Sequence, residues 1–501
     1  MGFCLLATWV CGSLPYTSLA DEPTGLAAAA SLEQAFIRVI EQGEPSVVSI
    51  ARDKIRTRVA DEFEDRLPRR AGAAREERSL ANPNYIPNEF GTGVIVGGDG
   101  LILTNYHVVR GGPIFGKKGP AEQDLYVRLA DRRGFPAQIF AADPRSDLAV
   151  LKIDAKNLAA VKLGNATGAR KGQLVVVLGN PYAVARDGSA RASWGIISNI
   201  SRPAHLEGDQ YDSEYKKKET IHHLGTLLQL DTRLNLGTSG SPVFNFRGEM
   251  IGLATSLAAI SGYEKSAGFA IPISDGTLRI IQSLLRGEEV EYGFLGISPS
   301  DISRDDEDFR PLAKQLRQTG AARVGGVIPN SPAGLGGLQK DDIIFSLNGR
   351  PISSRTDLMR EVGLMSPGSH AQLRVLRSGS REPIDLEVAL GKWPVQDDEG
   401  IVASHRRYPA WRGLGIDHNT ARSRYLQIQF RASSFPRAVL ITDVESPSAA
   451  ATAELQAGDF ITHINNQPVQ SPRQFYEVVR NLTGDAQLTL EGNRRVTLKS
   501  R

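Results

Sequence analysis

Residues 143–153 read Asp-Pro-Arg-Ser-Asp-Leu-Ala-Val-Leu-Lys-Ile, a turn-forming start followed by a short apolar run. Similar runs recur between residues 91 and 271, separated by glycine, proline or aspartate; examples are Gly93–Val96, Leu101–Thr104, Leu174–Leu178 and Met250–Ala254. Short apolar segments at this spacing predict an all-β barrel or sandwich and not alternating strands and helices.

The composition is ordinary for a soluble globular protein, with 41% hydrophobic and 23% charged residues. It excludes a wholly disordered chain, a collagen-like repeat and a multi-span membrane protein. The length of 501 residues predicts about three domains. The net charge of +3 gives no reason to expect nucleic acid as a partner.

The N-terminus has the pattern of a secretory signal peptide. Residues 2–20 carry no charged side chain, and Ser18-Leu19-Ala20 supplies the small residues of a cleavage site. We therefore predict a signal peptide over residues 1–20; the alternative is an uncleaved membrane anchor. Both cysteines, Cys4 and Cys11, lie inside it, so a cleaved chain has no cysteine for disulfides, metal binding or catalysis.

Two segments follow before the strand-rich region. Residues 31–50 open with a helical pattern that Gly43 and Pro45 end, and a strand-like run over 46–50 comes next. Residues 51–80 carry 16 charged side chains in 30 positions, which is too polar for a core. We expect a mobile surface loop there.

Three sites in the strand-rich region carry residues typical of nucleophilic catalysis. His107 follows one apolar run, Asp147 precedes another, and Ser239 lies in the loop Gly237-Thr238-Ser239-Gly240-Ser241-Pro242. Serine needs an adjacent base, histidine can take its proton, and a buried carboxylate can hold the histidine tautomer. Glycines around Ser239 allow backbone amides to converge on an oxyanion. Taken singly, each residue is more often an ordinary core histidine, turn aspartate or loop serine.

The C-terminal half contains an internal repeat. Ser331-Pro332-Ala333 and the run around Asp342 return as Ser446-Pro447-Ser448-Ala449 and the run around Asp459, which lies 117 residues later. Leu295-Gly296-Ile297 is answered by Leu414-Gly415-Ile416. A segment near 392–409, with Pro394 and several acidic residues, predicts a linker between the two copies.

Together these motifs make the sequence resemble the HtrA/Deg family of trypsin-like serine endopeptidases with C-terminal PDZ domains. The resemblance covers about residues 31–501. It rests on Thr104-Asn105-Tyr106-His107-Val108-Val109, on Asp143–Lys152 and on the Ser239 loop, with further matches at 178–181, 195–198, 229–231 and 268–272. It implies a mainly β chain, in which a double β-barrel protease domain over 31–288 precedes two α+β PDZ domains over 291–391 and 410–499.

The resemblance also implies roles for individual residues. His107 is expected as the general base, Asp147 as the orienting acid and Ser239 as the nucleophile. The backbone amides of Gly237, Thr238 and Ser239 are expected to form the oxyanion hole. The two loops Leu295-Gly296-Ile297 and Leu414-Gly415-Ile416 resemble the PDZ loops that receive a peptide carboxylate, each beside a helix, at 357–362 and 475–479.

Some positions depart from the family or are less specific. Thr238 stands where asparagine is usual, and Ser241 where glycine is usual, which raises the question of whether that site needs a positive φ. Leu234 is expected in the primary specificity pocket, opposite Thr255–Tyr263, and favours cleavage after small or medium aliphatic residues; the alternative is plain core packing. The stretch 201–223 aligns with a regulatory loop, and His222-His223 within it is a poor metal site.

These expectations combine into one function with two alternatives. We predict an ATP-independent periplasmic serine endopeptidase that degrades unfolded or misfolded proteins, binds peptide C-termini and forms homotrimers or multiples of trimers. No metal, organic cofactor or nucleic acid is expected. The alternatives are a catalytically impaired chaperone with a protease fold and a PDZ scaffold that recruits partners.

Overall fold

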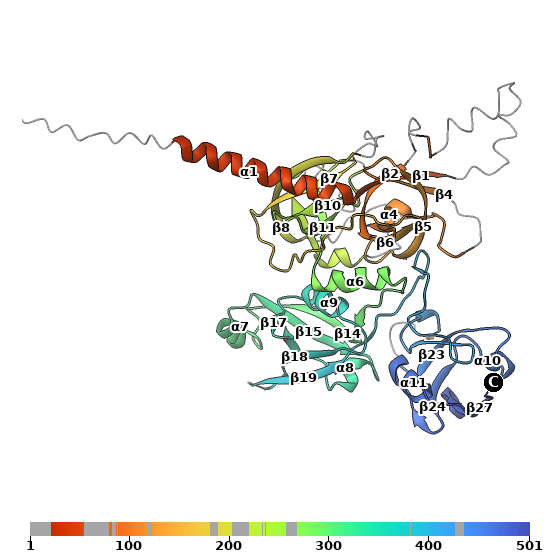
Figure 1. Ribbon diagram of the computed structural model, residues 1–501. Helices are drawn as coiled ribbons and strands as arrows, with labels where there is room; N and C mark the ends of the chain where they lie inside the picture. Colours follow the sequence, from red (N-terminus) through yellow and green to blue (C-terminus); the bar gives the residue numbers. More distant parts are fainter. Residues whose placement is uncertain are drawn as a thin grey trace, which may run out of the picture.

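The computed structural model describes residues 22–54, 80–82, 87, 89–117, 123–180, 189–202, 220–232, 234–235, 237–256, 268–380, 382–425 and 435–500. Within these residues two barrels form one end of the molecule, and two smaller α+β units form the other (Figure 1). This arrangement confirms the predicted mainly β architecture. The signal-peptide prediction for residues 1–20 lies outside the described residues.

The first barrel closes through the strand order β5-β4-β1-β2-β3-β6 and a further β5–β6 pairing. Its strands are β1 (Val47–Lys54), β2 (Glu89–Gly97), β3 (Leu101–Asn105), β4 (Gln123–Arg128), β5 (Gly134–Asp143) and β6 (Leu148–Ile153). The short helix α4 (Tyr106–Val109) follows β3 directly. Strands β3 and β6 are antiparallel neighbours with Asn105 opposite Leu148, so the residues after β3 and before β6 meet at one rim.

The second barrel closes through the order β10-β11-β12-β9-β8-β7. Its elements are β7 (Leu174–Gly179), β8 (Arg191–Arg202), the 3-10 helix η3 (Ile221–Leu224), β9 (Leu227–Leu230), β10 (Pro242–Phe244), β11 (Met250–Thr255) and β12 (Gly268–Pro272). Helix α6 (Asp275–Leu285) follows, and the Ser274 side chain caps its N-terminus. One apolar core, which includes Val150, Phe244 and Ile281, joins both barrels and this helix.

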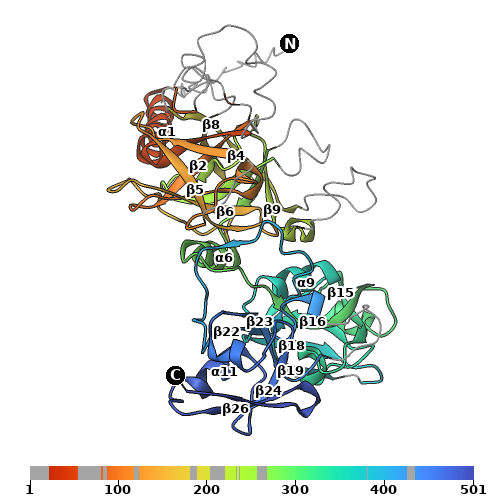
Figure 2. The ribbon, with the colours of Figure 1, turned by 90° about the vertical axis from the view of Figure 1, so that its right-hand side faces the viewer.

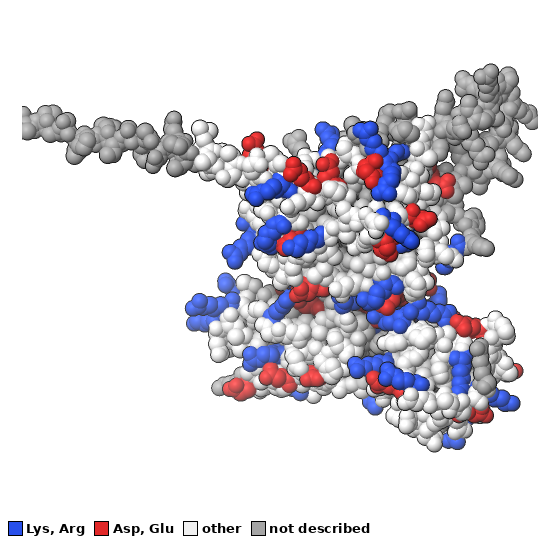
Figure 3. Space-filling view, viewed as in Figure 1, with Lys and Arg blue, Asp and Glu red and all other residues white. Residues whose placement is uncertain are grey.

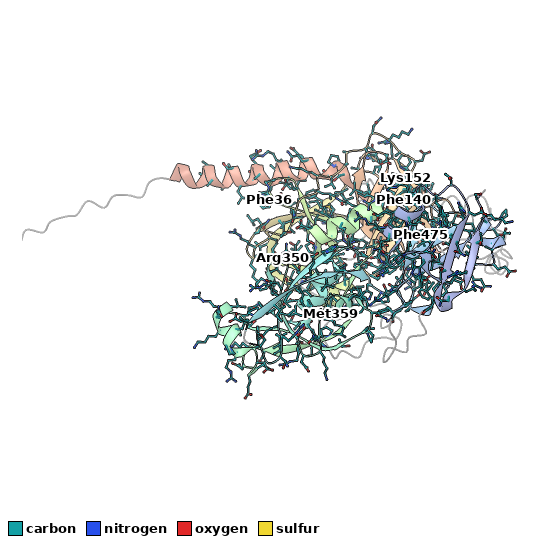
Figure 4. The ribbon with its side chains drawn as sticks, turned by 90° about the horizontal axis from the view of Figure 1, so that it is seen from below. Phe36, Phe140, Lys152, Arg350, Met359 and Phe475 are labelled. Carbon is teal, nitrogen blue, oxygen red and sulfur yellow. The ribbon has the colours of Figure 1, made fainter. Side chains whose placement is uncertain are left out.

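The N-terminal helix is longer than predicted. Helix α1 (Glu22–Gly43) begins nine residues before the predicted start, and its first turns, which are exposed with respect to the described residues, extend beyond the barrels (Figure 1). Phe36, labelled in Figure 4, attaches its later turns to the second barrel through Trp194, at 5.4 Å between ring centroids. The one-turn helix η1 (Glu44–Ser46) then leads into β1, which includes residues 51–54 of the predicted loop; residues 55–79 are outside the described part.

Each repeat folds into an α+β unit with its own apolar core. The first contains β13 (Gly293–Phe294), β14 (Ile297–Ser303), α7 (Arg310–Leu316), β15 (Gly320–Val327), α8 (Pro332–Leu335), β16 (Ile343–Leu347), β17 (Arg350–Pro351), α9 (Arg355–Gly363), β18 (His370–Leu376), β19 (Pro383–Ala389) and β20 (Gly391–Lys392). The second contains β22 (Leu414–His418), η4 (Ser423–Tyr425), β23 (Val439–Val444), α10 (Ala449–Thr452), β24 (Phe460–Ile464), β25 (Gln467–Pro468), α11 (Pro472–Val479), β26 (Ala486–Leu490), η5 (Glu491–Asn493) and β27 (Arg495–Leu498).

The segment predicted as a linker is partly built into the first barrel. Its residues Val402–Ala403 form β21, which pairs with Ala141 and Ala142 of β5. The other end of the segment, Lys392, belongs to β20 and is fully buried. Residues 392–409 therefore connect the two units by way of the barrel. The sequence could not show this, because a two-residue strand has no alternating pattern.

Helix α6 lies between the barrels and the two C-terminal units (Figures 1 and 2). Acidic and basic side chains are interspersed on the face shown in Figure 3. Among the described helices, none is both long enough and apolar enough to cross a bilayer.

Candidate active site

The predicted base and acid meet at the rim of the first barrel. His107 lies on α4 and Asp147 in the turn before β6. The His107 ring donates from Nδ1 to Asp147, with distances of 2.9 Å to Oδ2 and 3.0 Å to Oδ1. Because Nδ1 is used in this way, the unprotonated Nε2 faces the site as a hydrogen-bond acceptor.

Asp147 is fixed by several further bonds. Its backbone has φ +53°, a left-handed conformation that aspartate tolerates better than most residues. The amide of Tyr106 donates to the Asp147 carbonyl at 2.9 Å, and the amide of His107 to Oδ1 at 3.1 Å. The Thr255 hydroxyl, at the end of β11, donates to Oδ2 at 3.3 Å. The carboxylate is only 3% exposed, so its orientation is set by the protein and not by water.

A second acidic residue shapes the turn that carries Asp147. Buried Asp143 accepts from Arg145 Nε at 2.7 Å, from the amide of Ser146 at 3.1 Å and from the Tyr292 hydroxyl. Burial first, and then the charge of Asp143, raise the pKa of Tyr292 well above its ordinary value. Tyr292 immediately precedes the first C-terminal unit, so that unit is attached directly to the turn of the predicted acid.

His222 supports the same turn from the other side. It is buried in η3, where Nε2 donates to the Ser146 carbonyl at 2.8 Å and Nδ1 accepts from the Thr226 hydroxyl at 2.6 Å. Burial lowers its pKa, which keeps the ring neutral. This part of the predicted regulatory loop is therefore packed; residues 203–219 lie outside the described part. Arg360 of α9 donates to the Leu224 carbonyl at 3.1 Å, which links the first C-terminal unit to η3.

The predicted nucleophile lies between the two barrels. Ser239 is 8% exposed, and Gly237 and Gly240 on either side have φ values of +93° and +88°. A Cβ at Gly240 would overlap the carbonyl oxygen of Thr92, so only glycine fits there. Ser241, by contrast, does not have a positive φ, which answers the question that this position raised. Its buried hydroxyl has no hydrogen-bond partner among the described residues.

Thr92 on β2 is a site residue that the sequence reasoning missed. It is fully buried, and its hydroxyl donates to the Gly237 carbonyl at 2.7 Å and accepts from the amide of Asn180 at 3.0 Å. Its amide donates to the Ser239 carbonyl at 2.8 Å. One residue of the first barrel thus fixes the loop that carries Ser239. A threonine within a strand gives no sequence signal for this role.

Replacing Thr92 by valine keeps the side-chain shape but removes the hydroxyl. The Gly237 carbonyl and the Asn180 amide then lose their partner, at a cost of about 1–3 kcal/mol in folding free energy. A small shift of the Ser239 loop is expected to lower kcat by roughly 10- to 100-fold with little change in KM. Steady-state kinetics on casein fragments check this, with exposed Thr319→Val as the control. Wild-type kcat in the Thr92 variant would contradict it.

The three backbone amides predicted to form the oxyanion hole do not all point the same way. The amide of Thr238 donates to the Asn235 carbonyl at 3.1 Å, so it does not face the site as predicted. The amides of Gly237 and Ser239 donate to no acceptor within the described residues. The Thr92 hydroxyl donates to the Gly237 carbonyl. The amide of Thr238 belongs to the same planar peptide unit, so it points in the opposite direction to that carbonyl.

The three predicted catalytic side chains are not joined by one direct chain of bonds. The Ser239 hydroxyl donates to Ser256 Oγ at 2.9 Å, and Ser256 Oγ lies 3.4 Å from His107 Nε2. Ser256 follows β11 and belongs to the stretch Thr255–Tyr263, which was expected only as the wall of the specificity pocket. Its contacts with Ser239 and His107 were not predicted.

The predicted specificity residue Leu234 is partly buried and packs on the core of the second barrel. A Cβ at Gly268 would lie 2.9 Å from Leu234 Cγ, so the two residues are in close contact. Core packing was the alternative expectation for Leu234, and these contacts are of that kind. The facing wall beyond Ser256 lies outside the described residues.

The two loops predicted to receive a peptide carboxylate do not occupy equivalent positions in the two units. Gly296 has φ +81°, and its carbonyl accepts from the amide of Ile328 at 2.9 Å. In the second unit the same role belongs to Gly413, with φ +87° and a bond from Glu445 at 2.8 Å. Leu414 pairs with Val444 as Ile297 pairs with Val327. The loop that corresponds to Leu295-Gly296-Ile297 is therefore Arg412-Gly413-Leu414, and Gly415 and Ile416 lie within β22.

The helices beside these loops are present as α9 and α11. Leu358 and Val362 on α9 are almost fully buried in the core of the first unit, as are Phe475 and Val479 in the second. Core packing, the alternative for these apolar pairs, accounts for most of their surface. In the described part β14 pairs only with β15 and β22 only with β23, so each leaves one edge without a partner strand.

No three histidine, cysteine, aspartate or glutamate side chains in the described part are grouped so that they could hold a metal ion. The chemistry available at this site is that of a serine, a histidine and a buried carboxylate.

The chain matches the family model of a trypsin-like peptidase domain over residues 91–253, and those of PDZ domains over 293–388 and 440–494. Fold and sequence thus define a trypsin-like serine endopeptidase followed by two PDZ domains. A probable periplasmic serine endoprotease DegP-like of Pseudomonas fulva is 33% identical over 463 residues, covering 89% of this chain and 88% of the relative. Its counterpart in Pseudomonas fluorescens is 32% identical over 477 residues, with the same coverage. The chain belongs to the HtrA/DegP-like family of serine endoproteases.

Among solved structures, an HtrA-type protease AlgW with decapeptide has 27% sequence identity and a TM-score of 0.47. That match covers 72% of this chain and 99% of the other.

Proposed function

We propose that this endopeptidase hydrolyses unfolded or misfolded proteins in the periplasm, without ATP, through Ser239, His107 and Asp147. The observation that carries the proposal is the His107–Asp147 pair, at 2.9 Å and with the carboxylate buried, on the rim that the Ser239 loop faces. The relatives' names, which place them in the periplasm, support the location. Fractionation of cells into periplasm, cytoplasm and membranes tests this location.

In the proposed reaction Ser239 Oγ attacks the carbonyl carbon of a peptide bond, and His107 Nε2 takes up the proton that Ser239 loses. Asp147 stabilises the imidazolium that results. The amides of Gly237 and Ser239 donate to the oxyanion, since both are free of acceptors within the described residues. The imidazolium then protonates the leaving amine, and water hydrolyses the acyl-enzyme.

The two PDZ domains are proposed to hold substrate C-termini as added strands. The free edges of β14 and β22 offer backbone hydrogen bonds, and the glycine loops at Gly296 and Gly413 lie at the start of these strands. Arg360 of α9 bonds the Leu224 carbonyl in η3, and His222 of η3 bonds the Ser146 carbonyl in the turn that carries Asp147. These contacts support an influence of the first PDZ domain on the active site. We further propose a trimer or a multiple of trimers, which light scattering of the purified chain tests.

The test is casein degradation by the full chain and by Ser239→Ala, with exposed Ser380→Ala as the matched control. The proposal expects degradation by the wild type and by the control, and none by Ser239→Ala. Added ATP should change no rate. No degradation by any of the three, even with heat and an added peptide with a hydrophobic C-terminus, would overturn it. Suppression of casein aggregation in that case would favour the chaperone alternative.

A further inference from the structure

The segment that connects the two PDZ domains packs on the rim that carries the proposed base and acid. Its strand β21 (Val402–Ala403) pairs with Ala142 and Ala141, at the end of β5 that leads into the turn of the acid. The amide of His405 donates to the Gly287 carbonyl at 2.9 Å, which fixes the residues after β21. Figure 2 shows this blue segment leaving the C-terminal units and reaching the barrels next to α6.

Within this segment Gly400 lies against a neighbour of the base and a neighbour of the acid. Its φ is +81°. A Cβ at this position would overlap the Tyr106 hydroxyl and would lie 3.1 Å from Cγ of Pro144. Tyr106 directly precedes His107, and Pro144 lies in the turn that ends at Asp147. The segment thus approaches both sides of the rim so closely that only glycine fits.

Both residues that Gly400 contacts are buried and are bonded to Asp147. The amide of Tyr106 donates to the Asp147 carbonyl at 2.9 Å, and the amide of Asp147 donates to the Pro144 carbonyl at 3.3 Å. Val402 shares an apolar cluster with Tyr106 and is only 7% exposed. Residues 400–403 therefore contact helix α4 and the turn of the acid at the same time.

We infer that Gly400 is a positioning residue for the proposed reaction, and this inference rests on the proposed function. Gly400 contacts no reacting group. Through Tyr106 and Pro144 it fixes α4 relative to the turn of the acid, and so keeps His107 Nδ1 at 2.9 Å from Asp147 Oδ2. That bond holds the histidine in the tautomer that can take up the proton of the nucleophile. A segment between the PDZ domains thus completes the support of the active site.

The test is Gly400→Ala in the full chain, which places a methyl group against Tyr106 and should move α4 away from the turn. We expect kcat on casein fragments to fall roughly 10- to 100-fold with KM changed less than about twofold, because the catalytic groups are misplaced while substrate contacts stay. Gly349→Ala is the matched control, since Gly349 has φ +76° and no described atom lies within 4 Å of its Cβ position. Adding Tyr106→Phe to Gly400→Ala removes the overlapped hydroxyl and should recover part of the lost kcat.

The proton NMR signal of His107 Nδ1–H reports the bond to Asp147 without any catalysis. It should shift or broaden in Gly400→Ala and stay unchanged in Gly349→Ala, while circular dichroism checks that both variants fold. A wild-type kcat or an unchanged signal in Gly400→Ala would overturn the inference, and so would a loss of kcat that Tyr106→Phe leaves in full. A wild type that shows this signal but degrades no casein would instead overturn the proposed function.

Discussion

Replacing Asp147 by asparagine should lower kcat on casein fragments by about 10⁴-fold, as expected when the histidine of such a triad takes the wrong tautomer. The carboxylate accepts from Nδ1 and from the amide of His107, and an asparagine oxygen can satisfy only part of this pattern. Its NH₂ group can donate to Nδ1 and so place the ring proton on Nε2. The ring would then have no acceptor for a serine proton.

The loss should occur with little change in folding, since asparagine has nearly the same size and keeps the bond from Thr255 available. Circular dichroism and steady-state kinetics of the same preparation check both points. Exposed Asp154→Asn serves as the matched control and should retain wild-type kinetics. If Asp147→Asn kept more than a tenth of the wild-type kcat, the role of this carboxylate would be wrong.

The sequence located the three proposed catalytic residues because each lies at the end of an apolar run. Strands β3 and β6 bring the residues after one run and before the other to the same rim, and their register places Asn105 opposite Leu148. Glycines on both sides of Ser239 signalled a loop with unusual backbone angles, and Gly237 and Gly240 both have positive φ. Motif and strand pattern together were sufficient to predict that these three side chains lie near one another, and their catalytic roles are proposals.

Residues that support the site from within a strand could not be predicted in this way. Thr92 is one threonine in the middle of β2, and its bonds reach residues about 90 and 145 positions away. Ser256 likewise depends on how β11 lies between the two barrels. Such contacts follow from tertiary packing, which no periodicity in a single sequence records.

The second PDZ loop shows how a short motif can mislead. Gly413 and Gly415 are two residues apart, and the pattern Leu-Gly-Ile matched the later of them. The separation of 117 residues between Asp342 and Asp459 would have placed Gly296 opposite Gly413, as the structure does. A constant spacing across the repeat was the better guide, because strand register is preserved along a whole domain.

Lys392 has a structural role that the linker prediction did not anticipate. Its ammonium group lies 2.7 Å from Asp417, 3.2 Å from Glu289 and 3.4 Å from Glu291, and its side chain is 2% exposed. The two glutamates precede the first PDZ domain, and Asp417 lies on β22 of the second. Lys392, together with Arg422 on Glu289, therefore joins both PDZ domains to the connection from the barrels.

The pKa shifts in this cluster set the pH range over which it stabilises the fold. Burial alone would lower the pKa of Lys392, but the charges of Asp417, Glu289 and Glu291 raise it above its ordinary 10.5. Burial alone would raise the pKa of Glu289, but Lys392 and Arg422 lower it below its ordinary 4.5. The stabilisation is thus fully present between about pH 4.5 and 10.5. It is lost as pH falls through the lowered pKa of Glu289 or rises through the raised pKa of Lys392.

Lys392→Met should destabilise this junction by about 3 kcal/mol at pH 7, the lower end of the cost of breaking a buried ion pair, because its carboxylates keep other cations. Within the described residues Glu289 and Asp417 then keep only Arg422, and Glu291 keeps only Arg407. With a urea dependence of about 1–3 kcal/mol per molar, the midpoint of the junction's unfolding should fall by at least ~1 M. Trp393 follows Lys392 directly, and Trp411 lies shortly before Asp417 in the sequence. Their fluorescence reports the unfolding of this junction. The loss should shrink near pH 4, because the pKa of Glu289 is no longer lowered by Lys392 in this variant, and Asp417→Asn in the same background should recover part of it. Exposed Lys340→Met should leave the midpoint unchanged. A Lys392→Met midpoint equal to the wild type at pH 7 would mean that the other contacts, among them Arg360 with Leu224 and Arg422 with Glu289, hold the PDZ domains without this cation.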